Sequence, residues 1–197
     1  MIKRILCAAA AYMLGNISPA LIVSKSRGED IREKGSGNAG TTNVLRIYGK
    51  KAAAFTMLID VTKGVAAVLL GRTVCGADCA YLCALAVMCG HIWPVMHGFR
   101  GGKGVATTLG VLLTLHLPMG LSEAAVAITV IALSRMVSLG SLCAAAALPF
   151  VSRAMLPGFF PYALAISAIV IFKHRSNIGR LLRGEESKIS FKKKGDS

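Results

Sequence analysis

Charged residues are scarce in this chain of 197 residues, and acidic ones are scarcer still. Only 16% of the residues are charged, 54% are hydrophobic and the mean hydropathy is +0.62. Because soluble domains usually carry about a quarter charged residues, this composition excludes an ordinary soluble fold and predicts a protein embedded in lipid. The 23 Lys and Arg residues outnumber the nine acidic ones, but they occur in short runs between apolar stretches. We therefore expect a basic membrane protein without a nucleic-acid partner.

Cysteine pairs with CxxC spacing are also absent. The six cysteines nearly all fall inside apolar segments, and no cluster of His or carboxylate residues accompanies them. We expect them to act as small apolar side chains, and we predict no metal site and no cofactor. A signal-peptide cleavage site is missing too, because Gly15, Asn16 and Pro19 follow the first apolar run. That run is expected to be a retained first span.

Seven apolar stretches make up most of the chain. They cover residues 5–23, 52–71, 79–96, 105–117, 121–134, 139–152 and 158–172. A helix needs about 20 residues to cross about 30 Å of hydrocarbon, so several stretches are short and must tilt or pack behind neighbours. Backbone groups in lipid must be bonded within each segment, which predicts helices. We predict an all-α integral membrane protein with about seven transmembrane helices in a single domain, residues 1–197.

The orientation depends on residues 105–134, which could form one long helix or two short ones broken at Pro118, Met119 and Gly120. A hairpin places most of the basic residues on one side of the membrane. The loops on that side are residues 25–51, 97–104, 135–138 and 173–197. Because basic loops prefer the cytoplasm, we predict the hairpin, an outside N-terminus and a cytoplasmic C-terminus.

The first basic loop reads GSGNAGTTNVLR from Gly35 to Arg46. Its glycines allow backbone N–H groups to turn toward an oxyanion, Ser, Thr and Asn add neutral donors, and Arg46 supplies a planar cation. This combination favours a phosphate site, with a flexible interfacial loop as the alternative.

The second basic loop reads HIWPVMHGFRGGKGVAT from His91 to Thr107 and opens into an apolar helix. Three glycines around Lys103 at a helix start favour an anion site, because free N–H groups and the helix dipole both attract negative charge. A tight turn between helices is the alternative. A Walker A loop is excluded, because His97 and Gly104 stand where Gly and Ser or Thr are required.

The third segment follows the last span and contains HRSNIGRLLRGEE from His174. On a helix, His174 and Asn177 share a face and could point toward the site, while the Arg residues face water or head groups. By itself this segment would be a generic basic helix beside the membrane. Within the second span, Asp60 and Lys63 are three residues apart and are expected to pair, with a role in shaping the site as the alternative. The turn SRMVSLGS, residues 134–141, could add Arg135 or a serine.

Together these segments resemble the three motifs of the bacterial acyl-phosphate:glycerol-3-phosphate acyltransferases, the PlsY family. The similarity includes DVTKG at residues 60–64 and the SRMVSLGS turn, so it covers nearly the whole chain. Small departures, such as Trp93, concern substrate detail. The resemblance implies acyl transfer from acyl phosphate to the 1-hydroxyl of glycerol 3-phosphate, giving lysophosphatidic acid and phosphate for phospholipid synthesis. It also implies a location in the bacterial inner membrane, an active site on the cytoplasmic face, membrane lipid as a partner and the upstream acyl-phosphate-forming enzyme as a candidate partner.

Motif position assigns roles to individual residues. The resemblance implies that glycerol 3-phosphate or the reacting phosphate contacts Ser36, Arg46, Lys103, His174 and Asn177. It implies further substrate-binding residues: Gly37, Asn38, Gly40, Thr41, Asn43, Gly101, Gly102, Gly104, Thr107, Ser138 and Ser141. The glycines at 101, 102 and 104 would cradle the acyl phosphate through backbone N–H groups.

The catalytic signatures of other acyltransferases are missing. No His is followed five residues later by Asp, and no Ser-His-Asp order is evident. We therefore hypothesise that charge neutralisation and proximity supply most of the rate, with a substrate phosphate oxygen accepting the proton. A transporter for phosphate-bearing metabolites is the alternative of a different class. It is disfavoured because the polar segments lie on one side of the membrane instead of at its midplane.

Overall fold

The structure is a computed structural model that describes residues 1–189, and all of its regular elements are helices. Seven helices in this part have eleven or more residues. They are α1 (Ile2–Gly15), α3 (Thr41–Cys75), α4 (Ala77–Ile92), α5 (Val105–Leu115), α6 (Leu117–Ser134), α7 (Val137–Met155) and α8 (Phe160–Lys173). Two short helices, α2 (Pro19–Lys25) and α9 (Arg175–Leu182), and three 3-10 turns complete the described part. All seven predicted apolar stretches coincide with helices, which confirms the all-α membrane fold.

Fewer helices than predicted are long enough to cross a bilayer. Among the described residues, five spans are long and apolar enough, or six if α8 and α9 count as one bent span. The eleven residues of α5 measure about 16 Å, roughly half the thickness of the hydrocarbon layer. This short helix packs chiefly against α3 and α6, so neighbouring helices cover it. The chain is thus a multi-pass integral membrane protein.

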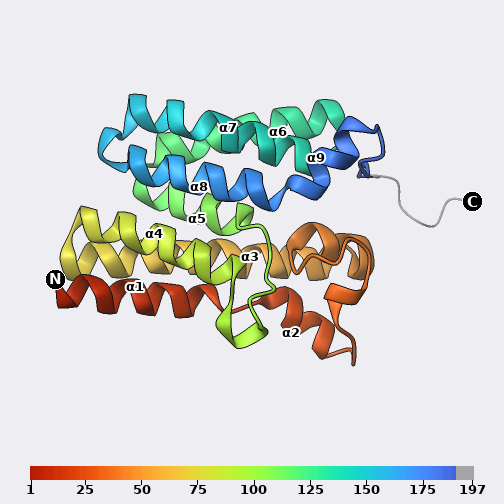
Figure 1. The fold of residues 1–197 in the computed structure, drawn as a ribbon, viewed down its shortest axis with the longest axis horizontal. Helices are drawn as coiled ribbons and strands as arrows, with labels where there is room; N and C mark the ends of the chain where they lie inside the picture. The colour runs from red at the N-terminus through yellow and green to blue at the C-terminus, as the bar shows by residue number, and fades with distance from the viewer. Residues whose placement is uncertain (190–197) are drawn as a thin grey trace, which may run out of the picture.

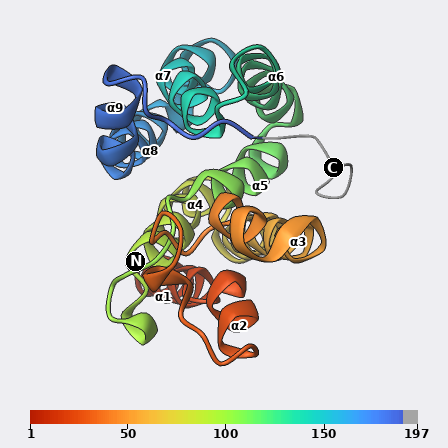
Figure 2. The same cartoon turned by 90° about the vertical axis from the view of Figure 1, so that its right-hand side faces the viewer.

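The helices form two groups that meet along α5 (Figures 1 and 2). One group contains α1, α3 and α4, and the other contains α6, α7 and α8. In Figure 1, the start of α3 and α9 lie toward the right-hand end, and the loop between α4 and α5 lies just right of the middle, whereas the α3–α4 and α7–α8 turns lie at the left. The segments that carry the three motifs therefore all lie on the side away from these two turns.

The predicted hairpin within residues 105–134 is confirmed, but the break lies at His116 and not at Pro118 to Gly120. Proline is tolerated in the first turn of a helix, where its missing N–H would have no partner. Pro118 therefore helps to begin α6, and the Nδ1 atom of His116 accepts a hydrogen bond from the Met119 N–H at 3.2 Å.

Three predicted loops are shorter than expected. Residues 41–48 are helical and belong to α3, which is kinked at Gly49, where φ is 82°. The loop predicted at 135–138 consists of Arg135 and Met136 only, so Ser138 lies on α7. The loop predicted at 173–197 contains α9, and its last residues, 190–197, lie outside the described part.

The predicted pairing of Asp60 with Lys63 is confirmed by a distance of 2.7 Å between Oδ1 and Nζ. The same ammonium group donates to the carbonyls of Gly15 (3.2 Å) and Ile17 (2.8 Å) and lies 2.8 Å from His91 Nδ1. These carbonyls lie at the break between α1 and α2, where no helical N–H reaches them. One buried lysine therefore connects this break with α3 and α4.

Candidate active site

The first motif loop is organised from within by Asn43, which is buried on the first turn of α3. Its Oδ1 accepts a hydrogen bond from the Ser36 N–H at 3.0 Å. Its Nδ2 group donates to the carbonyls of Ile31 and Lys34, at 3.3 and 2.9 Å. The side-chain amide of Asn43, a predicted substrate-binding residue, thus forms its hydrogen bonds within the loop itself. These bonds hold residues 36–38 at the surface.

Arg32 joins the first motif loop to the second. Its guanidinium group pairs with Asp30, with 2.6 Å between Nη2 and Oδ2, and donates to the His97 carbonyl at 2.9 Å. The Arg32 hydrogen bonds outweigh partial desolvation and hold the pKa of Asp30 below its usual value. The two loops are consequently fixed relative to each other by a charge-assisted contact.

In the second motif loop, two of the three glycine N–H groups that were predicted to bind phosphate already have backbone partners. The N–H groups of Gly101 and Gly102 donate to the carbonyls of Ile92 and His91, each at 3.2 Å. These bonds satisfy the last turn of α4 as the chain leaves it. The first helical bond of α5 joins the Thr108 N–H to the Gly104 carbonyl at 2.8 Å. Among the described residues, the N–H groups of Gly104 and of residues 105–107, at the positive end of α5, therefore have no backbone acceptor.

Gly102 has a steric reason to be glycine. A Cβ atom on this buried residue would overlap the imidazole ring of His91. The ring of His91 also contacts the ammonium group of Lys63 through Nδ1. The GGKG turn thus rests directly on the buried Asp60–Lys63–His91 group.

The three motif segments line a cleft of about 290 Å³. Its walls are Ser36, Gly37, Asn38, Phe99, Arg100, Gly101, Lys103, Lys173, Arg175, Ser176 and Arg180. A second cleft of about 260 Å³ is lined by Gly35, Ser36, Arg46, Arg180 and Ser187. Ser36 and Arg180 belong to both clefts, so the predicted residues Ser36, Arg46 and Lys103 lie around adjoining hollows.

The larger cleft is strongly cationic. Five of its lining residues are Lys or Arg, and none is acidic. Burial, followed by the nearby Arg180, lowers the pKa of Lys103 to about 8. A doubly anionic ligand would relieve the repulsion between these cations, so the cleft suits a phosphate group.

A single carboxylate, Glu186, organises the wall behind these cations. It accepts hydrogen bonds from the Ser138 hydroxyl (2.8 Å), the Asn177 amide (2.8 Å) and Arg180 Nε (2.7 Å). The Asn177 Oδ1 in turn accepts a hydrogen bond from the Lys103 ammonium group. Burial alone would raise the pKa of Glu186. The three donors together lower this pKa by more than burial raises it, so the net shift is downward. Glu186 is therefore ionised and fixes Asn177, which holds Lys103.

His174 is buried at the junction of α8 and α9. Its Nδ1 atom lies 2.8 Å from the Val170 carbonyl, which can only accept a hydrogen bond. The proton therefore resides on Nδ1, and Nε2 carries a lone pair. Burial, together with the charge of Lys103, lowers the pKa of His174 to about 4. The imidazole is neutral at physiological pH.

Several predicted substrate-binding residues do not line either cleft. Gly40 and Gly104 are the N-cap residues of α3 and α5. The Ser141 hydroxyl donates to the Val137 carbonyl within its own helix, at 2.9 Å. The hydroxyl oxygens of Thr41 and Thr107 are buried without a hydrogen-bond partner among the described residues.

Other residues reach the site without having been predicted. They are Phe99, Arg100, Lys173, Arg175, Ser176, Arg180, Glu186 and Ser187. Arg175 and Arg180 were expected to face water or head groups, but a bend of 58° between α8 and α9 brings them to the cleft. The only sequence signal for this was their place in a motif that also contains His174 and Asn177.

Replacing Glu186 by glutamine should destabilise the site. The substitution removes the counter-charge of Arg180 and leaves Asn177 without its charged acceptor. Because Arg180 is partly exposed, we expect a loss of about 2 kcal/mol in the free energy of unfolding, together with weaker binding of inorganic phosphate. Thermal unfolding and phosphate titration in detergent measure both effects. Glu185→Gln is the matched control, because Glu185 pairs with Arg183 in an exposed position. Equal effects of the two substitutions would contradict the role of Glu186.

Comparison with known proteins agrees with this geometry. Residues 5–184 match the family model described as glycerol-3-phosphate acyltransferase. The chain is 48% identical to the glycerol-3-phosphate acyltransferase of Clostridioides difficile (strain 630), over 96% of this chain and 97% of the relative. It is 46% identical to the corresponding protein of Thermoanaerobacter sp. (strain X514), over 95% and 96% of the two chains.

A solved structure shares the fold. The glycerol 3-phosphate form of PlsY, an integral membrane glycerol 3-phosphate acyltransferase, superimposes with a TM-score of 0.91 at 34% identity, covering 95% of this chain and 96% of that one. Its lysophosphatidic acid form superimposes with a TM-score of 0.86. The chain therefore belongs to the glycerol-3-phosphate acyltransferase family of integral membrane enzymes.

Proposed function

We propose that this enzyme transfers a fatty acyl group from acyl phosphate to the 1-hydroxyl of glycerol 3-phosphate, releasing phosphate and lysophosphatidic acid. The observation that carries the proposal is the convergence of three motif segments around a cleft lined by five cations and no carboxylate. Both substrates bear phosphate, so a donor activated by phosphate fits this cleft. The PlsY forms with glycerol 3-phosphate and lysophosphatidic acid support the acceptor and the product.

The two adjoining clefts would bind different substrates, the smaller cleft the acceptor and the larger cleft the donor. Ser36 and Arg46 face the smaller cleft, where they would hold the phosphate of the acceptor. Lys103 lines the larger cleft and would hold the phosphate of the donor. Helix α5 begins two residues later, so the positive end of its dipole would favour negative charge near Lys103. Phe99 lines the larger cleft, and 57% of the surface of this residue is exposed. Its apolar surface would let the acyl chain of the donor remain in lipid.

Charge neutralisation and proximity would drive the reaction. The 1-hydroxyl oxygen attacks the acyl carbonyl carbon, the bond between that carbon and the phosphate oxygen breaks, and Lys103 neutralises the departing phosphate. The hydroxyl proton passes to a phosphate oxygen, whose pKa of about 6 suits this role at neutral pH. His174 is a weaker base, because its pKa is about 4. Its Nε2 lone pair would instead orient the hydroxyl group, and Asn177 would position Lys103.

We further propose that the cleft faces the cytoplasm and that the N-terminus lies outside. The support is the distribution of charge. The loops at residues 25–51, 97–104, 135–138 and 173–189, which include the charged parts of the motif segments, contain most of the Lys and Arg residues among residues 1–189, and basic loops prefer the cytoplasmic side. On that side the soluble acceptor would enter from the cytosol.

A donor comparison tests the reaction. Purified enzyme given acyl phosphate and glycerol 3-phosphate should form lysophosphatidic acid and phosphate in equal amounts, whereas acyl-CoA should yield no product. Lys103→Ala should reduce the rate by about 10²- to 10³-fold, because it removes the charge that faces the leaving group. Lys188→Ala, at an exposed position outside both clefts, is the control. Equal rates with the two donors, or movement of glycerol 3-phosphate across vesicles without product, would refute the proposal.

His174→Gln separates orientation from base catalysis. Glutamine keeps a hydrogen-bond acceptor but cannot take a proton at neutral pH. We expect a fall in kcat of about tenfold or less, well below the effect of Lys103→Ala. The measurement is kcat together with glycerol 3-phosphate binding. A loss as large as that of Lys103→Ala, with unchanged binding, would instead identify His174 as the base.

The pH profile tests the charge of Lys103. Because the pKa of Lys103 is about 8, its ammonium form dominates below pH 8 and is lost as the pH rises above it. Glycerol 3-phosphate stays doubly anionic there, since its second pKa is about 6. The ratio kcat/KM should therefore fall by about tenfold per pH unit above pH 8. Lys103→Arg, whose guanidinium stays charged, should lower the rate but remove this decline. An unchanged decline would assign the titration to another group.

A further inference from the structure

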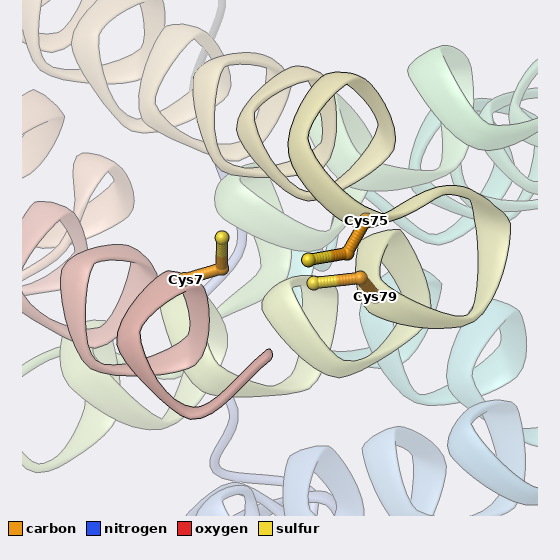
Figure 3. A group of neighbouring side chains, drawn as sticks. All are labelled: Cys7, Cys75 and Cys79. Atoms are coloured by element: carbon orange, nitrogen blue, oxygen red, sulfur yellow. The ribbon is translucent and has the colours of Figure 1, made fainter. Parts of the chain in front are cut away.

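Three cysteines from three helices meet at the end of the molecule opposite the cleft. Figure 3 shows Cys7 on α1, Cys75 at the end of α3 and Cys79 at the start of α4, and Figure 1 places the α3–α4 turn at the left-hand end. Their three sulfur atoms all lie within 4.8 Å of one another. The chain positions gave no sign of this group, because Cys7 is separated from the other two by most of α1 and all of α2 and α3.

The cysteine group is preformed and accessible from one side. Cys79 is fully buried and Cys7 is 6% exposed, whereas Cys75 is partly exposed. All three thiols are free. The turn between α3 and α4 is fixed by Gly76, where φ is 81°, and packing at Gly71 holds α3 against the backbone of Cys79. Packing of the surrounding helices alone therefore brings the sulfur atoms together.

The distances fit a metal thiolate after a small contraction. Three sulfur atoms bound to one ion at about 2.3 Å would be about 4.0 Å apart, so each pair has to close by less than about 1 Å. Thiolate ligands without imidazole or carboxylate favour soft ions, above all Cu(I). The carboxylate of Asp78, which precedes Cys79 in the sequence, is paired with Arg4, with 3.5 Å between Oδ2 and Nη2. We propose that Cys7, Cys75 and Cys79 form a binding site for one soft, thiophilic metal ion of the Cu(I) or Cd²⁺ class.

Charge balance is compatible with this site. Each cysteine that binds the ion releases its proton to water, so three thiolates and one Cu(I) ion carry a net charge of −2. Arg4 and Arg72 stand one helical turn before Cys7 and Cys75 and supply positive charge at the same end. A bound ion would connect the ends of α1, α3 and α4 that lie away from the cleft. It should therefore stabilise the fold without entering the reaction.

A titration with Cd²⁺ tests the proposal. The reduced full-length protein in detergent should develop an ultraviolet sulfur-to-metal absorption that saturates at one Cd²⁺ per chain. Cys79→Ser and, separately, Cys75→Ser should abolish this absorption, while acyltransferase activity reports that each variant is folded. Cys89→Ser and Cys143→Ser are matched controls and should bind as the unmodified protein does. Bound Cd²⁺ or Cu(I) should also slow alkylation of Cys75 and raise the unfolding temperature only where the three cysteines are intact.

Other outcomes would overturn the metal site. Absorption that does not saturate, or that persists in Cys79→Ser, would mean that Cd²⁺ binds elsewhere. If the reduced protein binds neither Cd²⁺ nor Cu(I), and a thiol oxidant instead joins Cys75 to Cys79 in a disulfide, the group is a redox pair and the proposal is wrong.

Discussion

Mutual repulsion among the cations of the cleft is the constraint that the site has to overcome before any substrate arrives. One buried carboxylate, that of Glu186, offsets part of this repulsion. It accepts hydrogen bonds from Ser138, Asn177 and Arg180. Through Asn177 the same carboxylate reaches Lys103. The arrangement leaves a surplus of positive charge, and that surplus is what a phosphate-bearing ligand can use.

Membrane burial fixes most of the remaining architecture. Because lipid offers no partners to the backbone, the apolar stretches had to be helices, and their positions were predictable from hydropathy alone. The motif residues Ser36, Arg46 and Lys103 line the clefts. They could be picked out from the sequence because few residue types suit phosphate at a glycine-rich turn, and their contact with phosphate stays a prediction. Hydropathy also showed that several stretches were too short to cross without help, but it could not predict which neighbours cover them, as the packing of α5 against α3 and α6 shows.

The rest of the site depends on geometry that no local pattern encodes. Arg180 reaches the cleft only because α9 bends by 58° from α8. Glu186 reaches Ser138 because the segment after α9 folds back, with the Ile189 N–H donating to the Arg135 carbonyl at 2.8 Å. The N–H group of Gly101 was assigned to substrate from the motif resemblance, yet it donates to the Ile92 carbonyl at the end of α4. A bend between helices decided the first of these cases, and backbone hydrogen bonds between separate segments decided the other two.

The lysine buried beneath the GGKG turn joins that turn to a distant part of the chain. Lys63 has three ammonium hydrogens for four neighbouring acceptors: the carbonyls of Gly15 and Ile17, Asp60 and His91. Only three of these acceptors can receive an ammonium hydrogen at one time, and His91, whose ring lies against Gly102, is among them. Lys63 thus ties the break between α1 and α2 to the loop that precedes α5, across more than forty residues of sequence on one side and nearly thirty on the other.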